Sequence, residues 1–294
     1  MRNAFIDELV VLARSNPQIA LIVGDLGWSV VEPFADEFPD RFLNAGVAEQ
    51  NMTSMAAGMA SEGYHVFTYS IANFPTFRCA EQIRNDVDYH KLPVTVVAVG
   101  GGVAYGNLGY SHHAVQDYAL MRSLPNMLIA SPGDPMEVRA CLRYLVSNPQ
   151  PSYLRLGKAG EPQYHNEVPV ISPGEWVILD KGQSSNTFLT TGATLQLAME
   201  AKQKLRDYCD HGVASLPLWG MRYKSMISEM VGGFERVHIL EDHFQDGGFG
   251  SWVVEGLMSQ PELVQRISAN HLSRDVYDIV AKSDTLWKRG LSNL

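Results

Sequence analysis

The stretch Asn44-Ala45-Gly46-Val47-Ala48-Glu49-Gln50-Asn51-Met52 sets a single acid, Glu49, at the head of a small, apolar, helix-like run over residues 52–60. A carboxyl group packed among alanines and methionines can stay protonated near neutral pH and donate a hydrogen bond. In the alternative interpretation, Glu49 only complements the positive end of a helix in its first turn, as many acids do. The position of the acid leaves both roles open.

Short apolar runs on either side of this stretch predict buried strands. Residues 19–23, 94–99 and 127–130 are almost continuously apolar, and each run ends in a turn rich in Gly or Asp. Such runs suit strands that are covered on both faces, as in a parallel α/β sheet. Helical patterns alternate with them, which indicates βαβ units. The predicted helices lie near residues 2–15, 48–62, 75–89, 115–123 and 134–147.

A second α/β region follows a looser segment. Prolines and glycines recur from about residue 161 to 185, which predicts an interdomain connection with some strand content near 175–179. We therefore expect one domain at 1–162, a linker at 163–184 and a second domain at 185–294. In the second domain the pattern predicts strands at 188–192, 213–218 and 237–240, a helix near 194–208 and another helix opening at 247–250.

The composition excludes several classes of protein. The 294 residues are 46% hydrophobic and 19% charged, with a net charge of −9, which fits a globular chain of about two domains. The acidic balance argues against a nucleic-acid surface, because phosphates would be repelled. No apolar run approaches the roughly 18 residues of a membrane span, and no secretory signal is visible. We expect a cytoplasmic protein with reduced thiols at Cys79, Cys141 and Cys209.

The predicted strand ends locate the candidate site. Ligands of open α/β sheets bind beyond the carboxyl ends of the strands, and this rule places residues 25–29, 100–113 and 131–134 on one rim. The glycine-rich turns lack the spacing of a dinucleotide fingerprint, and no Walker A sequence is present. No G-x-S-x-G nucleophile elbow occurs either. The rim therefore carries none of the common nucleotide or serine-hydrolase motifs.

The stretch around Glu49 resembles the pyrimidine-binding domain of thiamine-diphosphate enzymes, and the closest group is the transketolase family, which includes 1-deoxyxylulose-5-phosphate synthase. The resemblance rests on residues 46–52 and 56–60 and covers nearly the whole chain. It implies an α/β fold with a pyrimidine-binding, parallel-sheet domain at 1–162 and a transketolase C-terminal domain at 185–294. The further motifs that carry it are residues 81–86, 124–127, 131–134 and 151–156 in the first region, and 190–192, 241–243 and 247–250 in the second.

The resemblance implies that Glu49 activates thiamine diphosphate. In this family a glutamate hydrogen-bonds a pyrimidine ring nitrogen and favours the imino tautomer, whose exocyclic nitrogen removes the C2 proton. Phe74, with Phe77 as second choice, matches the aromatic residue that packs on the pyrimidine, and such stacking adds stabilisation. Asp25 resembles an acid near the thiazolium and the dimer contact. In the alternative, both phenylalanines are ordinary core residues.

The resemblance also implies a set of substrate contacts. Arg2 and Arg155 match arginines that bind sugar phosphate, and arginine suits this task because its planar fork meets phosphate oxygens in bidentate fashion. Arg78 resembles a third phosphate contact of the deoxyxylulose enzymes, and Ser29 matches a serine that contacts the donor sugar. His112 matches a histidine that hydrogen-bonds the substrate carbonyl and hydroxyl. His113 is expected to be an accessory residue, and a solvated surface arginine is the alternative for each guanidinium.

Two departures from the family pattern concern the substrate. Leu108 stands where the family usually has an aspartate that recognises a sugar hydroxyl, and Gly100 stands where it has a second histidine. Leucine cannot accept a hydrogen bond, so burying that hydroxyl unpaired would cost about 1–3 kcal/mol. We therefore expect the acceptor to differ from ordinary aldose phosphates by being deoxygenated, modified or unusually large.

The chain also lacks the family's diphosphate signature. The sequence has no Gly-Asp-Gly motif and starts directly at the pyrimidine domain. We therefore expect the C-terminal subunit of a split transketolase, an α2β2 assembly in which an N-terminal partner subunit holds the diphosphate through Mg²⁺. It would move a two-carbon ketol unit between sugar phosphates or modified sugars. Two alternatives stay open: a β-type subunit of a 2-oxoacid decarboxylating, deoxyxylulose-synthase-like or acyloin-forming enzyme, and a non-catalytic scaffolding subunit.

Overall fold

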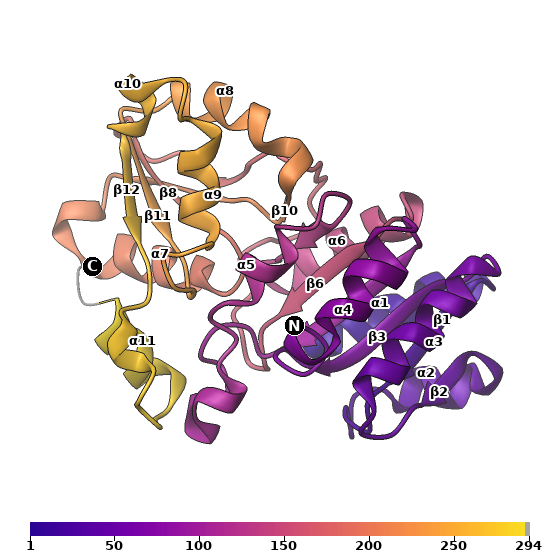
Figure 1. Ribbon diagram of the computed structural model, residues 1–294. Coiled ribbons are helices and arrows are strands. Elements are labelled where there is room, and N and C mark those ends of the chain that lie inside the picture. Colours follow the sequence, from indigo (N-terminus) through magenta and orange to yellow (C-terminus); the bar gives the residue numbers. More distant parts are fainter. Residues whose placement is uncertain (292–294) are drawn as a thin grey trace.

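Two mainly parallel sheets, each covered by helices, organise the chain (Figure 1). A computed structural model describes residues 1–291. The first sheet has seven strands in the order β10-β5-β6-β4-β3-β1-β2. Its strands are β1 (Ile19–Val23), β2 (Phe42–Asn44), β3 (His65–Ile71), β4 (Val94–Val99), β5 (Leu128–Ala130), β6 (Ser152–Leu156) and β10 (Leu218–Trp219).

The buried strand β1 shows why this sheet takes helices on both faces. All five of its residues are buried, and alternate side chains point to opposite faces of a sheet. Ile19, Leu21 and Val23 belong to one apolar core, whereas Ala20 and Ile22 belong to another. An unbroken apolar run therefore builds two cores at once, as the sequence predicts for a parallel sheet.

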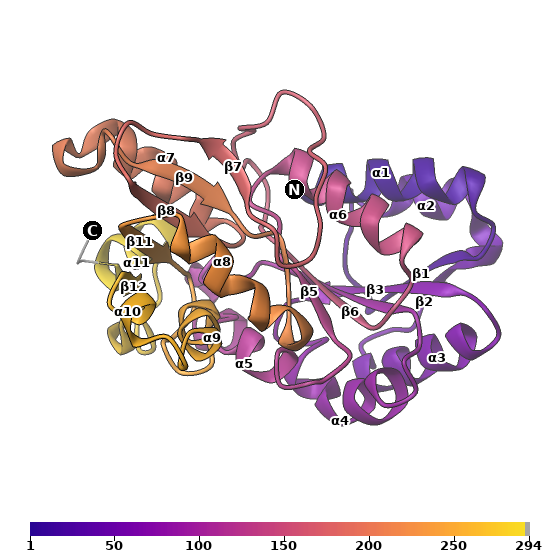
Figure 2. The same ribbon diagram turned by 90° about the horizontal axis from the view of Figure 1, so that it is seen from above.

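The helices of the first domain form two layers about its sheet (Figure 2). One layer lies above the sheet in that view, and the other lies below it. The upper layer consists of α1 (Arg2–Ser15), α2 (Glu32–Glu37) and α6 (Pro135–Ser147), and the lower layer of α3 (Glu49–Ser61), α4 (Ala80–Gln82) and α5 (Asp117–Met121). Asp134 caps α6 by accepting the backbone N–H groups of Met136 and Glu137.

The second sheet has five strands in the order β12-β11-β8-β9-β7, and only β7 is antiparallel to its neighbour. Its strands are β7 (Val177–Asp180), β8 (Asn186–Thr190), β9 (Gly212–Ser215), β11 (Arg236–Leu240) and β12 (Ile267–Asn270). The helices of this region are α7 (Thr194–Lys204), α8 (Ile227–Gly232), α9 (Phe249–Gly256), α10 (Pro261–Val264) and α11 (Ser283–Gly290).

Three expectations drawn from the sequence need correction. The predicted helix over 75–89 is broken into a 3₁₀ turn at Phe77–Cys79, the short α4 and a π-helical turn at Ile83–Asp88. The predicted strand over 213–218 is two strands, because β10 leaves the second sheet and pairs antiparallel with β5 of the first. The strand content predicted near 175–179 is confirmed as β7, but β7 pairs with β9, so the second sheet starts inside the predicted linker.

Candidate active site

Most of the predicted site residues lie just beyond the carboxyl ends of the parallel strands, as the rule for open α/β sheets predicts. Asp25 and Ser29 follow β1, Glu49 follows β2 as the first residue of α3, and His112 lies in the long loop after β4. The loop after β3 carries Phe74, Phe77 and Arg78. Residues that are far apart in the sequence thus share one edge of the first sheet.

Glu49 is buried at this edge, with 2% of its surface exposed. Its Oε2 atom accepts a hydrogen bond from Nη1 of Arg78 at 2.8 Å. A Cβ atom at Gly24, just past the end of β1, would lie only 3.4 Å from Cγ of Glu49. The carboxyl group is therefore held between the end of β1 and the first turn of α3, where a helix favours negative charge.

Phe74 and His112 continue the contacts from Arg78. The guanidinium carbon of Arg78 lies 4.6 Å from the centroid of the Phe74 ring, within cation–π range. The rings of Phe74 and His112 meet edge to face with centroids 5.3 Å apart. Nδ1 of His112 lies 2.9 Å from the Ser111 hydroxyl oxygen. We call Glu49, Arg78, Phe74 and His112 the Glu49 arc, because each contacts the next.

Two loop residues with positive φ stand beside the arc. Asp25 and Ser29 have φ angles of 56° and 65°, in the left-handed region that non-glycine residues seldom adopt. The Asn44 amide donates to Oδ1 of Asp25 at 3.0 Å, and its Oδ1 accepts the Asp25 backbone N–H at 3.1 Å. The backbone N–H of Ser29 donates to Glu32 at 2.7 Å. Asp25 is thus tied to the strand that leads to Glu49.

Phe77, the second choice for the ring that packs on a pyrimidine, lies apart from the arc's contacts. Its side chain is 48% exposed. It lines a surface hollow together with Tyr110 and Ser111, on the outer side of the loop that carries His112. Phe74 is therefore the aromatic residue that the structure places next to Arg78 and His112.

A second cationic group lies at the ends of β4 and β6. Nζ of Lys158 lies 5.1 Å from the centroid of the Tyr105 ring. Gly100 has a φ of 84°, and a Cβ atom there would overlap the same ring. The positive charge of Arg2 lowers the pKa of both Tyr105 and Tyr69. Burial has the opposite and larger effect, and it raises the pKa of Tyr69 to about 12. Lys158 and Tyr105 were not predicted from the sequence, although both follow predicted or observed strands.

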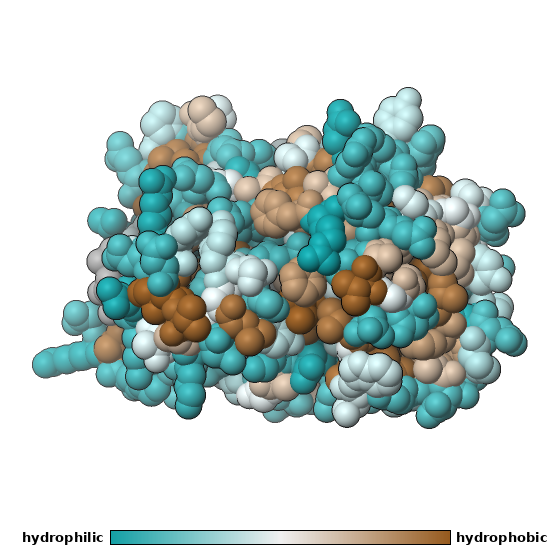
Figure 3. All heavy atoms as spheres, turned by 60° about the horizontal axis from the view of Figure 1, so that its bottom comes forward, coloured by the Kyte–Doolittle hydropathy of each residue, from teal (hydrophilic) through white to brown (hydrophobic). Residues whose placement is uncertain are grey.

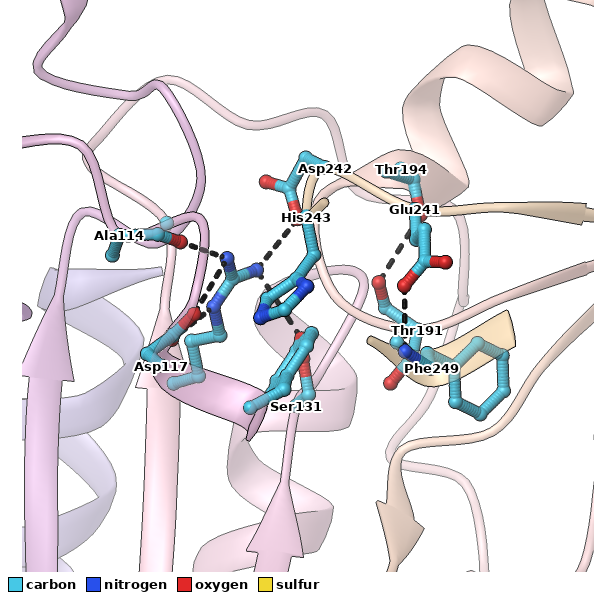
Figure 4. Close-up of polar contacts among 12 residues, drawn as sticks. Ala114, Asp117, Ser131, Thr191, Thr194, Glu241, Asp242, His243 and Phe249 are labelled. Carbon is cyan, nitrogen blue, oxygen red and sulfur yellow. Dashed lines mark hydrogen bonds and ion pairs between the residues drawn. The ribbon is translucent and has the colours of Figure 1, made fainter. Parts of the chain in front are cut away.

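Arg155 is placed differently from the other predicted residues, because it is buried and its partners Asp117 and Asp242, both labelled in Figure 4, come from the two domains. Nε donates to Asp117 at 2.7 Å, and Nη1 donates to Asp242 at 2.6 Å and to the Tyr118 hydroxyl at 3.2 Å. Nη2 donates to the Ala114 carbonyl at 2.7 Å and to Asp117 at 3.4 Å. A guanidinium has five N–H donors, and all five have partners. This arrangement corrects the predicted phosphate contact, because Arg155 has no donor left for a substrate.

We call Arg155, Asp117, Asp242 and Tyr118 the Arg155 hub, and a neutral acid lies beside it. Glu241 accepts backbone hydrogen bonds from Phe249 at 2.6 Å and Gly250 at 3.2 Å (Figure 4). Burial raises the pKa of Glu241 to about 8. The resemblance gave residues 241–243 no role, and in the structure Asp242 and His243 contact Arg155 and Tyr118 of the first domain.

The Glu49 arc fits one half of a thiamine cofactor. A buried carboxyl group and an adjacent aromatic ring match the ring nitrogen and the flat face of a pyrimidine. Within residues 1–291, no group of three or more His, Cys, Asp or Glu side chains could hold a metal ion. In the same described part of the chain, no helix is long and apolar enough to cross a membrane.

Comparisons with known proteins agree with the geometry. The chain matches two family models, "Transketolase, pyrimidine binding domain" over residues 1–161 and "Transketolase, C-terminal domain" over residues 174–283. It is 34% identical over 272 residues to one of the subunits of the apulose-4-phosphate transketolase of Phocaeicola vulgatus, covering 90% of this chain and 86% of the relative. It is 29% identical to the 1-deoxy-D-xylulose-5-phosphate synthase of Clostridium perfringens, covering 99% of this chain but only 48% of that enzyme.

A solved structure is similar over almost the full chain. It is described as "Split gene transketolase, inactive beta4 tetramer", and it superposes with a TM-score of 0.83 at 31% identity. The match covers 99% of this chain and 93% of the solved one. The order of the two domains and both sheets therefore agree with a known two-domain arrangement.

Proposed function

The chain belongs to the transketolase family, and from that premise we propose that it is the subunit of a split transketolase that supplies the pyrimidine side of the thiamine-diphosphate site. The observation that carries the proposal is the Glu49 arc, in which a buried acid, an aromatic ring and a histidine follow one another at a single sheet edge. A transferase of this family needs these three chemical groups at one place.

Thiamine diphosphate, when bound, would supply carbanion chemistry at this place, with Glu49 and Phe74 as the residues that would hold its pyrimidine. The roles of this chain's own residues follow from their positions. Glu49 would hydrogen-bond the pyrimidine ring nitrogen, because its carboxyl group is buried at the same sheet edge as Phe74 and His112. Phe74 packs on the ring. His112 donates to or accepts from the substrate oxygens, since imidazole changes its charge near neutral pH.

Arg78 has to give way for this to happen. It donates to Oε2 of Glu49 at 2.8 Å, whereas a pyrimidine ring nitrogen would need the Glu49 carboxyl group as its own partner. The Arg78 side chain is 45% exposed, so it has room to turn toward solvent. We propose that it leaves Glu49 as the cofactor enters and then faces the substrate, where its charge suits a phosphate.

Arg2 and Lys158 replace Arg155 in the proposed substrate site. Both lie around Tyr105 at the carboxyl edge, and Ser29 and Asp25 lie in the neighbouring loop after β1. Two cations at one place suit a phosphomonoester, and a sugar phosphate is also what the name of the Phocaeicola vulgatus relative specifies. Leu108 and Gly100 remove two polar contacts, so the sugar itself is expected to be modified or deoxygenated near its carbonyl.

A partner subunit completes the proposed site. The loops around Glu49 expose the large apolar side chains of Trp28, Val47, Phe77 and Leu108, each about half exposed or more. Apolar side chains gather in patches on the face that Figure 3 turns forward, which includes the lower edge of Figure 1. Such patches mark protein interfaces. We propose that an N-terminal-type transketolase subunit covers them, supplies the diphosphate and Mg²⁺ ligands, and forms an α2β2 assembly in the cytoplasm.

Two other functions stay open for experiment. The relatives named 1-deoxy-D-xylulose-5-phosphate synthase keep open a deoxyxylulose-synthase-like function that decarboxylates a 2-oxoacid. A scaffolding subunit without a catalytic role is disfavoured by the intact Glu49 arc. The solved relative described as an inactive β4 tetramer agrees with a chain that needs a different partner for activity.

Co-expression with a Gly-Asp-Gly-containing N-terminal subunit tests the proposal. Ketol transfer is assayed from phosphorylated ketoses, and CO₂ release is assayed from pyruvate in a parallel reaction. We expect ketol transfer, and we expect Glu49→Gln to lower kcat by about 10²–10⁴-fold. Glu62→Gln, an exposed acid just after the same helix, is the control. Full turnover by Glu49→Gln would show that Glu49 does not activate the cofactor, and CO₂ release without ketol transfer would favour the synthase-like reaction.

A further inference from the structure

The end of the chain packs on the loop that carries His112. After β12 the chain leaves the second sheet, and residues 271–291 run back to the carboxyl edge of the first domain, at the lower left of Figure 1. We call residues 271–291 the brace. Its Leu272, Val276 and Leu286 share a buried apolar core with Val103 and Val115, which flank the loop at both ends.

The contacts continue along the two 3₁₀ turns of that loop, Gly106–Leu108 and Tyr110–His112. The Ala281 backbone N–H donates to the Gly106 carbonyl at 3.2 Å. A Cβ atom at Gly106 would overlap Leu286 of the brace and lie 2.5 Å from the Ala281 carbonyl oxygen. Only glycine permits so close an approach at this position.

The second turn meets the brace next. A Cβ atom at Gly109 would lie 3.2 Å from Val280. The rings of Tyr110 and Tyr277 have centroids 4.1 Å apart. His112 ends this turn, so the side chain that faces Phe74 is two residues from the last contact with the brace.

We propose that Leu286 and Tyr277 are positioning residues that hold His112 in place from the C-terminal domain. Short 3₁₀ turns have poor hydrogen-bond geometry and are weak by themselves, so their order depends on packing. Within the first domain, Asn73 ties the turn down by donating to the carbonyls of Ser111 and His113 at 3.1 and 2.8 Å. The brace supplies the packing from the second domain. This inference rests on the proposed function of His112.

Hydrogen exchange of the backbone amides of 106–112 tests the packing without any assumption about the reaction. Leu286→Ala should speed their exchange by about tenfold or more, because a buried leucine is removed from the brace core. Leu286→Met keeps the volume and should leave exchange nearly unchanged. Leu263→Ala, in α10 and in a different core, is the matched control. Equal exchange in Leu286→Ala and the parent chain would overturn the proposal.

Activity of the assembled two-subunit enzyme tests the consequence for His112. A shift of a catalytic group by about 1 Å can lower the rate by about 100-fold, so we expect Leu286→Ala and Tyr277→Ala to lower kcat at least about tenfold. The KM for thiamine diphosphate should not change, and Tyr277→Phe should restore kcat. Tyr277 is half exposed, so its variants fold even if Leu286→Ala does not. If the amides of 106–112 exchanged fast in these variants while kcat stayed unchanged, the brace would not position His112 for the reaction.

If the parent complex shows no ketol transfer at all, the proposed function fails. The positioning of His112 by the brace is then tested on this chain without a partner subunit. In that case the ring resonances of His112, followed by ¹⁵N NMR, should move in Tyr277→Ala and stay in Tyr277→Phe. Exposed His90 serves as the reference ring. An unmoved His112 resonance in Tyr277→Ala would overturn the inference.

Discussion

The Glu49 arc and the Arg155 hub each contain an arginine paired with an acid near the carboxyl ends of the first sheet's strands, yet they differ in completeness. In the hub, every donor of Arg155 has a partner, and Asp117, Asp242 and Tyr118 are fully or almost fully buried. In the arc, Arg78 is half exposed, and apolar side chains such as Val47 face outward beside Glu49.

This difference separates the work of the two regions. A buried arginine with all its bonds made holds two domains in one arrangement, because removing either carboxylate leaves an uncompensated charge. An arc with a movable arginine and an uncovered apolar rim can admit a ligand and a partner. The hub therefore holds the two domains in one arrangement, and the arc is the part of the site that another molecule completes.

Replacing Arg155 should have the largest effect on stability. Arg155→Met leaves Asp117 and Asp242 buried without a countercharge, so the free energy of unfolding should fall by about 3–5 kcal/mol. Urea denaturation measures it. Arg274→Met breaks an ion pair in which both side chains are almost fully exposed, and it should change the free energy by less than about 0.5 kcal/mol. A variant Arg155→Met with parental stability and a raised KM for phosphorylated sugar would make the hub a substrate site after all.

A charge placed beside the arc should weaken assembly with the partner subunit and leave the stability of this chain unchanged. Val47 is 75% exposed beside Glu49. If the partner subunit covers it, Val47→Glu should weaken the complex by about 2 kcal/mol, or about 30-fold in Kd, as at a buried interface position. Analytical ultracentrifugation measures the Kd. Val170→Glu, 97% exposed in the segment between the sheets, is the control. An equal loss in both variants, or no loss in either, would argue against an interface at the arc.

The pH dependence of stability tests the acids near the hub. Burial raises the pKa of Glu241 from 4.5 to about 8, so between these values the folded chain keeps a proton that the unfolded chain has released. The free energy of unfolding should therefore fall as pH rises from about 5 to 8. Burial also raises the pKa of Glu137, to about 7, which acts in the same direction.

Glu241→Gln isolates that contribution. The amide keeps one oxygen, which can accept the N–H group of Phe249, gives up the longer contact from Gly250 and has no proton to lose. Denaturation at several pH values should give a shallower decline than in the parent, so the variant gains most relative to the parent at pH 8 and above. A variant with the parental slope would show that Glu241 is not the protonated group.

The residues of the arc were expected from the resemblance of residues 46–52 and their surroundings to a known family. The rule that parallel strands end at the same edge accounts for Glu49 and His112, which follow strands of one sheet. The role of Arg155 could not be predicted in this way. Whether Arg155 keeps a donor free for a substrate depends on Asp117 and Asp242. These two acids lie 38 and 87 residues away along the chain.

Strand β3 escaped prediction for a related reason. Its sequence mixes His65, Thr68 and Ser70 with apolar residues, which reads as polar although the strand is almost fully buried. His65 reaches the Thr95 hydroxyl at 2.8 Å, and Thr95 reaches Ser152 at 2.7 Å. These partners lie on neighbouring strands, so the burial of β3 depends on contacts that its own sequence does not contain.

Calorimetric titration of thiamine diphosphate, with Mg²⁺ present, tests most directly whether the arc is an incomplete site. The titration is run on this chain alone and on its complex with the N-terminal-type subunit. We predict little or no heat with the chain alone, with a Kd above about 1 mM, and binding at least about 100-fold tighter in the complex. Tight binding to the isolated chain would contradict the account, because the Glu49 arc would then be a complete site.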